Sequence, residues 1–128
     1  MKKITLLLVI IFTFLFSNTS WGDWSYVTEN GGIKYYYDKD RVRKSGKFLY
    51  FWDLIDFIKQ TKGYFSITGY IQLDCSIFRY KRLKIQGYKN SMGEGDIDYG
   101  WNPEDKWEYP LRNSSYEYMY NKICEEHQ

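Results

Sequence analysis

The sequence predicts an α+β fold: a predominantly antiparallel β-sheet followed by a C-terminal helix that one disulfide holds in place. Three observations lead to this prediction. Segments rich in tyrosine, tryptophan and β-branched residues alternate with glycine-containing turns along most of the chain. Apolar residues recur at helical spacing near the C-terminus. The chain also has two cysteines, Cys75 and Cys124, which lie in these two parts of it.

Residues 1–22 are typical of a secretory signal peptide. Lys2 and Lys3 precede an apolar run from Ile4 to Phe16, and Ser20-Trp21-Gly22 suits cleavage before Asp23. The run is shorter than the roughly 20 apolar residues that cross a bilayer as a helix, and an uncleaved N-terminal anchor is the alternative. No cysteine lies at the cleavage region. The sequence therefore predicts an exported protein that is not a lipoprotein and is periplasmic, on the cell surface or extracellular.

The first strands are expected to form a hairpin. Trp24 to Thr28 is aromatic and β-branched, which fits a first strand, and Asn30-Gly31-Gly32 is a turn signal. Ile33 to Asp38 would form the returning strand. The polar residues 38–44 that follow favour a loop or a single helical turn. Lys47 to Ile58 is next. Its two faces are both apolar at first, which predicts a central strand covered on both sides.

The middle of the chain predicts two more strands. Thr61-Lys62-Gly63 is a turn, and Tyr64 to Tyr80 reads as one long strand with a bulge at Gly69. Its inward face would carry the alternating apolar residues Ile71, Leu73, Cys75 and Ile77. A turn near Tyr80-Lys81 would then lead into Arg82 to Tyr88, with Leu83 and Ile85 inward.

The last part of the chain predicts a loop, a short strand and a helix. Asn90 to Asp105 holds several glycines and few aliphatic residues, which favours a long surface loop, and Lys106 to Tyr109 is a short strand. Ser114 and Glu117 have the spacing of a capping box, which marks the start of a helix. The stripe that this helix would bury comprises Tyr116, Met119, Tyr120 and Ile123.

The two cysteines predict one disulfide. An even, minimal cysteine count in an exported chain favours a single bond, and free thiols or a metal pair are the alternatives. Closing a loop between Cys75 and Cys124 would stabilise the fold by roughly 4 kcal/mol in the chain-entropy model. Because Cys124 adjoins the buried stripe and Cys75 lies on the apolar strand face, the bond would fasten the helix to the sheet.

Charge excludes one class of function and leaves another open. Removing residues 1–22 leaves 106 residues (128 minus 22), a single domain, with 16 basic residues (18 minus Lys2 and Lys3) and 16 acidic ones. A neutral chain argues against a nucleic-acid binder. Residues 34–89 nevertheless carry 13 Lys and Arg against 5 Asp and Glu, whereas residues 90–128 carry 3 against 9. The two parts either neutralise each other on folding or form opposite surface patches.

Catalytic motifs are not recognisable. The chain has one histidine, His127, close to the C-terminus, which disfavours Ser–His or Cys–His catalysis. Asp53 with Asp56 is a carboxylate pair that glycoside hydrolysis would need, and Asp96-Ile97-Asp98 is a weak candidate for calcium. Met92 to Gly95 is a turn rather than a phosphate cradle, because no Lys-Ser/Thr follows it. We therefore predict no enzyme, no cofactor and no metal.

Binding surfaces are the stronger hypothesis. A basic set with nearby tyrosines flanks the second predicted hairpin and offers charge for attraction and rings for anchoring. An ordinary solvated hairpin is the alternative. A second candidate is the acidic, aromatic loop from Glu94 to Glu108, unless its Trp101 and Trp107 fold back onto the sheet. The basic candidate site comprises Lys59, Lys62, Tyr64, Arg79, Tyr80, Lys81, Arg82, Lys84, Tyr88 and Lys89.

The order of several residues resembles a known family. The chain contains, in sequence, Trp24, Tyr36-Tyr37-Asp38, Trp52-Asp53-Leu54, Ser66, Asp74-Cys75 with Arg79, Tyr88, Met92-Gly93-Glu94-Gly95, Trp107 with Pro110, and Ile123-Cys124. This arrangement resembles the surface-adhesin protein E family of exported bacterial proteins. The resemblance implies an antiparallel sheet, a C-terminal helix and one disulfide. It also implies an adhesin that binds host matrix or plasma proteins such as vitronectin and laminin.

We therefore expect a secreted or surface-associated, non-enzymatic protein-binding domain. The alternatives are a periplasmic inhibitor of a hydrolase such as lysozyme and an envelope structural factor. An exposed edge strand would allow a homodimer.

Overall fold

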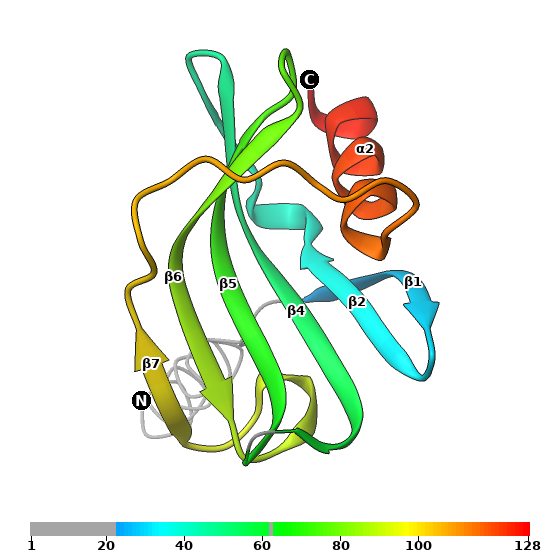
Figure 1. The fold of residues 1–128 in the computed structure, drawn as a ribbon, viewed down its shortest axis with the longest axis vertical. Helices are drawn as coiled ribbons and strands as arrows, with labels where there is room; N and C mark the ends of the chain where they lie inside the picture. The colour runs from blue at the N-terminus through cyan, green and yellow to red at the C-terminus, as the bar shows by residue number, and fades with distance from the viewer. Residues whose placement is uncertain (1–22, 62) are drawn as a thin grey trace, which may run out of the picture.

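The fold is a twisted antiparallel sheet with one helix across one face (Figure 1). The structure, a computed structural model, describes residues 23–61 and 63–128, so the predicted signal peptide and Lys62 lie outside the described residues. The elements are β1 (Trp24–Asn30), β2 (Ile33–Asp38), η1 (Lys39–Arg41), β3 (Arg43–Ser45), β4 (Phe48–Thr61), β5 (Tyr64–Asp74), β6 (Arg79–Tyr88), η2 (Ser91–Gly93), β7 (Ile97–Trp101) and α2 (Ser115–His127).

The predicted fold class is confirmed. In the described residues the sheet has seven strands in the order β1-β2-β4-β5-β6-β7, with β3 beside the start of β4, and every pairing is antiparallel. Cys75 and Cys124 form the predicted disulfide. No helix in the described part of the chain is both long and apolar enough to cross a membrane.

The core lies between α2 and the sheet. Met119, Tyr120 and Ile123, from the predicted stripe, are fully buried. Their sheet partners come from alternate positions on the strands, so that Phe51 contacts Tyr120 with ring centroids 5.8 Å apart. Each such side chain contributes about 1.5–3 kcal/mol on burial. The other buried core residues are Val27, Tyr37, Leu49, Ile71, Leu73, Tyr80 and Cys124.

The helix begins as predicted, with one difference. The Ser114 hydroxyl accepts a hydrogen bond from the Glu117 amide at 3.1 Å. The Glu117 carboxylate accepts a hydrogen bond from the amide of Asn113 rather than that of Ser114, also at 3.1 Å. The Ser114 hydroxyl in turn donates to the Leu111 carbonyl. These bonds satisfy backbone groups that a helix start leaves without partners.

The prediction of one strand from Tyr64 to Tyr80 is wrong, because the chain turns directly after Asp74. The Asp74 carboxylate accepts bonds from the Ser76 amide and hydroxyl and from the Ile77 amide, and this folds the backbone over residues 75–78. Ile77 is consequently 54% exposed rather than inward-facing. Cys75 lies in this turn and not on a strand face.

The predicted bulge is also misplaced. Tyr70 pairs with Lys84 and Ile71 pairs with Arg82, so the extra residue is Leu83 on β6 and not Gly69 on β5. The bulge changes the alternation along β6. Leu83, predicted inward, is 37% exposed, whereas Ile85 is buried as predicted.

The expected long loop from Asn90 to Asp105 contains ordered structure. Residues 97–101 form the edge strand β7, in which Tyr99 and Trp101 pair with Gly87 and Ile85 of β6. η2 precedes it. In contrast, the predicted strand Lys106 to Tyr109 is reduced to a single bridge between Glu108 and Tyr80.

Candidate protein-docking surface

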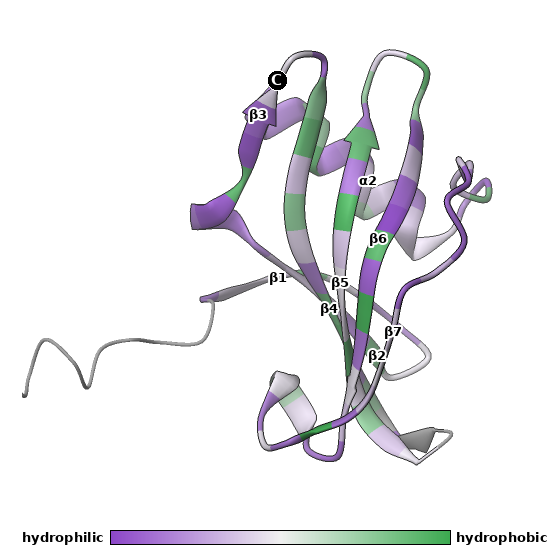
Figure 2. Ribbon diagram, turned by 90° about the vertical axis from the view of Figure 1, so that its left-hand side faces the viewer, coloured by the Kyte–Doolittle hydropathy of each residue, from purple (hydrophilic) through white to green (hydrophobic). Residues whose placement is uncertain are grey.

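The two faces of the sheet are covered differently. α2 lies over the face that carries Leu49 and Phe51, and Figure 2 looks onto the sheet with α2 behind it. The opposite face carries the alternate residues of the same strands. η2 folds over one end of it, where a side chain at Gly93 would meet Leu54 and Thr68. The prediction that β4 is covered on both sides therefore fails over its first half.

Large aromatic side chains occupy the uncovered part of this face. We call this surface the aromatic face. Its rings are the half-buried Phe48, Tyr50, Trp52, Tyr70 and Trp107. Its cations are Arg43, Lys47, Arg79, Lys81 and Lys84. The register aligns its members in rows across the strands. One row runs Arg43, Tyr50, Gln72, Lys81, and the next runs Trp52, Tyr70, Lys84.

The rings hold one another in place. Tyr50 stacks on Tyr70 with centroids 6.3 Å apart, and Trp52 lies 5.1 Å from the same ring. The Gln72 side-chain amide donates to the Tyr50 hydroxyl at 3.1 Å. Fixed aromatic rings with exposed edges lose little conformational freedom on binding, which is why such residues dominate protein interfaces.

Cations lie over the outer rings. The Arg43 guanidinium lies 5.0 Å from the Tyr50 centroid, and the Lys47 ammonium lies 5.4 Å from that of Phe48. On the other side, Arg79 and Lys81 both lie over Trp107, at 4.1 and 4.7 Å. These distances are within the range of cation–π attraction.

The basic and acidic parts of the chain partly neutralise each other. Ion pairs join Lys81 to Asp105 at 2.8 Å, Arg82 to Glu108 at 3.5 Å and Lys89 to Asp98 at 3.6 Å. Each links β6, or the residue after it, to the acidic segment that follows. Neutralisation on folding, one of the two interpretations of the charge asymmetry, thus accounts for Lys81, Arg82 and Lys89.

The ten predicted binding residues are not brought together. Arg79, Lys81 and Lys84 lie on the aromatic face, whereas Arg82 pairs with Ile71 and turns to the side of α2. Tyr80 and Tyr88 are buried. The Tyr64 ring covers Gly87, which has no side chain to obstruct it. Lys59 and Lys89 are exposed at the far end of the sheet, and Lys62 lies outside the described residues.

Sequence reasoning missed the aromatic rows. The alternation of Phe48, Tyr50 and Trp52 was visible, but it did not show which face α2 would cover. Tyr70 and Gln72 joined them only through the strand register. The signal that was available is the unusual size of the residues on one face of β4, where a solvated face normally carries small polar groups.

In the second predicted surface, from Glu94 to Glu108, the two tryptophans fold onto the sheet while most other residues stay exposed. Trp101 and Trp107 are half-buried, and Trp107 contacts Phe48 with centroids 5.6 Å apart. Tyr99 stays exposed and lies 4.8 Å from the Trp101 ring. Trp107 thereby becomes part of the aromatic face.

The carboxylates proposed for catalysis point apart. Asp53 lies on the α2 side and accepts a 2.9 Å hydrogen bond from the Tyr120 hydroxyl. Asp56 lies on the other face and accepts a hydrogen bond from the Met92 amide. The Gly93 amide donates to the Ser66 hydroxyl, so amides of the turn at 92–95 bond within the protein. Among the described residues, no three metal-binding side chains gather in one place.

Asp53 gives the fold a pH dependence. Burial raises the pKa of this carboxyl to about 6, although the bond from Tyr120 opposes the rise. The folded state then binds a proton between about pH 4 and 6 that the unfolded state releases, so stability falls by about 3 kcal/mol as the pH rises through this range. We expect Asp53→Asn to remove most of this fall in the free energy of unfolding, measured with urea at pH 4 to 7.

Asp96→Asn, at an exposed position, is the control and should leave the fall unchanged. If the free energy of unfolding changes equally with pH in wild type and both variants, Asp53 is not its cause.

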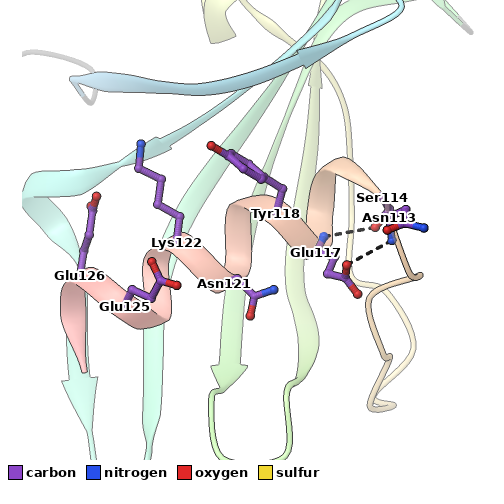
Figure 3. Close-up of a pocket in the computed structure, with 8 residues that line it drawn as sticks. All are labelled: Asn113, Ser114, Glu117, Tyr118, Asn121, Lys122, Glu125 and Glu126. Atoms are coloured by element: carbon purple, nitrogen blue, oxygen red, sulfur yellow. Dashed lines mark hydrogen bonds between the residues drawn. The ribbon is translucent and has the colours of Figure 1, made fainter.

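Hollows also lie on the α2 side of the sheet. One of about 560 Å³ follows the outer side of α2 and is lined mainly by polar residues, with Lys122 and Tyr118 pointing to one side of the helix and Asn121 to the other (Figure 3). A smaller one of about 90 Å³ lies beside Asp53, between Trp101 and Tyr116. Neither combines fixed aromatic rings with unpaired cations, as the aromatic face does.

Comparisons with known proteins agree with the fold. A family model described as surface-adhesin protein E matches residues 24–125. The chain is also similar to the solved structure of Haemophilus influenzae protein E, with 14% sequence identity, a TM-score of 0.62, and coverage of 84% of this chain and 88% of that one. At this identity the likeness shows a shared fold. No curated protein matches the chain significantly.

Proposed function

Because the chain belongs to the surface-adhesin protein E family, we propose that it is an exported, non-enzymatic domain that binds a protein partner through the aromatic face. Family membership supports an adhesin at or beyond the cell surface. Host matrix and plasma proteins such as vitronectin and laminin are the proposed partners.

One observation carries the choice of surface. Five large aromatic side chains lie half-buried, fixed by mutual contacts, on a part of the sheet that neither α2 nor η2 covers. Burying such residues only partly in a monomer leaves apolar area that a partner can cover. The cations on both sides add attraction at a distance and specificity in contact. Of the predicted basic residues, Arg79, Lys81 and Lys84 contribute to this surface.

The experiment measures binding of oxidised residues 23–128 to immobilised vitronectin, laminin and lysozyme by biolayer interferometry, at low and physiological salt. We expect saturable binding to a matrix or plasma protein that weakens with salt. Trp52→Ala should weaken it by about 2 kcal/mol, or roughly thirtyfold in Kd, because a central aromatic anchor is lost.

Tyr118→Ala is the matched control, since Tyr118 is an exposed aromatic residue on the outer side of α2 (Figure 3). Equal loss in both variants would show that the aromatic face is not the binding surface. Binding to lysozyme alone would favour the inhibitor. Absence of binding to all three, together with inaccessibility to antibody on intact cells, would favour an envelope factor.

A further inference from the structure

We infer that the aromatic face accepts an acidic, extended segment of its partner protein, laid across the strands with one carboxylate at each end and an apolar side chain between them. This inference rests on the proposed function and adds the chemistry of the partner.

The spacing of the cations sets the length of the segment. Arg43 and Lys81 are the two ends of one row, on β3 and β6, with Tyr50 and Gln72 between them. Three strand spacings separate these ends, a distance of about 14 Å. An extended peptide covers this distance in about four residues.

The same four-residue step places three side chains on one side of the peptide. Side chains alternate along an extended chain, so positions 1, 3 and 5 face the sheet together. Acidic residues at positions 1 and 5 would reach the two cations. The residue at position 3 would then rest on the rings of Tyr50 and Tyr70. The predicted recognition pattern is therefore acid-x-apolar-x-acid.

The charge balance of this surface favours an anionic partner. Among the described residues, Arg43, Lys47 and Lys84 have no carboxylate within 4.0 Å. Lys81 pairs with Asp105, whose side chain is 84% exposed, so a partner carboxylate can replace this pair at little cost. Asp74 lies in the neighbouring row but is fully buried and bonded to Arg79.

The arrangement fits a peptide better than a polyanion. A sulfated polysaccharide or a nucleic acid carries charge at short, regular intervals and favours a continuous line of cations. Here rings separate the cations, and an apolar group must fill the middle. A side chain that covers these rings also excludes water from the flanking ion pairs, which strengthens them.

The test uses a nine-residue probe, acetyl-Gly-Ser-Glu-Ser-Leu-Ser-Glu-Ser-Gly-amide, titrated into the ¹⁵N-labelled oxidised domain and followed by NMR. We expect shifts centred on the indole signals of Trp52 and Trp107 and on the amides of β4 and β5. Replacing both glutamates of the probe with glutamine, or its leucine with serine, should each weaken binding at least about fivefold.

Variants of the protein complete the test. Arg43→Glu and Lys81→Glu should each weaken binding of the probe at least about tenfold, because attraction is replaced by repulsion. Arg112→Glu, an exposed position beside the start of α2, is the control and should bind normally. Thermal melts check that all three variants are folded.

Equal binding of the glutamine probe would overturn the inference, as would an unaffected Kd in both variants. Tighter binding of a heparin oligosaccharide that depends on the same two residues would also overturn it and make the face a polysaccharide site. If the acidic probe fails while vitronectin or laminin still binds in a Trp52-dependent way, the inference is wrong and the proposed function stands. If the matrix proteins also fail to bind, the proposed function is wrong as well.

Discussion

Replacing Cys75 and Cys124 with serine is expected to lower the free energy of unfolding by about 4 kcal/mol, because the bond closes a loop across a sequence separation of 49. For a domain of this size the melting temperature should fall by roughly 15 to 30 °C. The bond joins the turn after β5 to the last turns of α2, so in the unfolded chain it keeps these two segments close together and lowers the entropy of that state. Thermal and urea unfolding with and without reductant measure the effect.

Ile77→Ala is the matched control for this prediction. Ile77 is exposed in the same turn as Cys75, so truncating it disturbs the local sequence but leaves the bond intact. We expect a change below about 0.5 kcal/mol. If reduced and oxidised wild-type protein melt at the same temperature, packing alone holds α2, and the disulfide is unnecessary for stability.

Asp74→Ala is expected to destabilise the domain by about 3 kcal/mol, because a fully buried carboxylate organises the turn after β5. Its oxygens accept bonds from Ser76, Ile77 and Arg79. The variant would leave these donors without their acceptor and the Arg79 side chain without its anion. Urea unfolding at pH 7 measures the change.

Asp74 also determines how the stability of the domain changes in acid. Burial alone would raise the pKa of Asp74, but the bonds from Ser76 and Arg79 outweigh it and hold the pKa below its ordinary value. Stability from this group is therefore present above the unfolded-state pKa of about 3.9 and is lost as the pH falls through the lower folded-state value. Asp40→Ala, at an exposed position, is the control. An equally small effect of both changes at pH 7 would show that the turn forms without Asp74.

The parts of the fold that local patterns determine could be predicted from the sequence. The hairpin of β1 and β2 follows from its glycine turn, and α2 follows from the Ser114 cap and the spacing of its buried residues. The cysteine pairing follows from the count. Each of these depends on residues close in sequence or, for the disulfide, on a single possible partner.

The errors have two physical origins. The turn at 75–78 is local, since Asp74 accepts hydrogen bonds from the amides of Ser76 and Ile77 just after it, and apolar alternation through Ile77 concealed it. The other errors arise because long-range strand pairing decided the outcome. Leu83 forms a bulge only because Tyr70 and Ile71 bond to residues on either side of it. The sequence of β7 only weakly favours a strand, and this segment is a strand because its backbone pairs with the edge of β6.

The candidate surface shows the same division. Arg79, Lys81 and Lys84 were identified from the charge of one segment. Their aromatic neighbours come from β4, from Tyr70 of β5 and from the segment after β7, and the register of the sheet aligns those on the strands. Composition indicated that many rings must be present, but it could not separate the rings of the core from those of the aromatic face.

The alternation of the central strands has a consequence for how this family can diversify. On β4, Leu49 and Phe51 belong to the core, while Tyr50 and Trp52, one position away, face outward. Substitutions at the outward positions can therefore change the exposed surface without disturbing the packing that keeps the chain folded. Every second residue of these strands is free to vary on an unaltered framework.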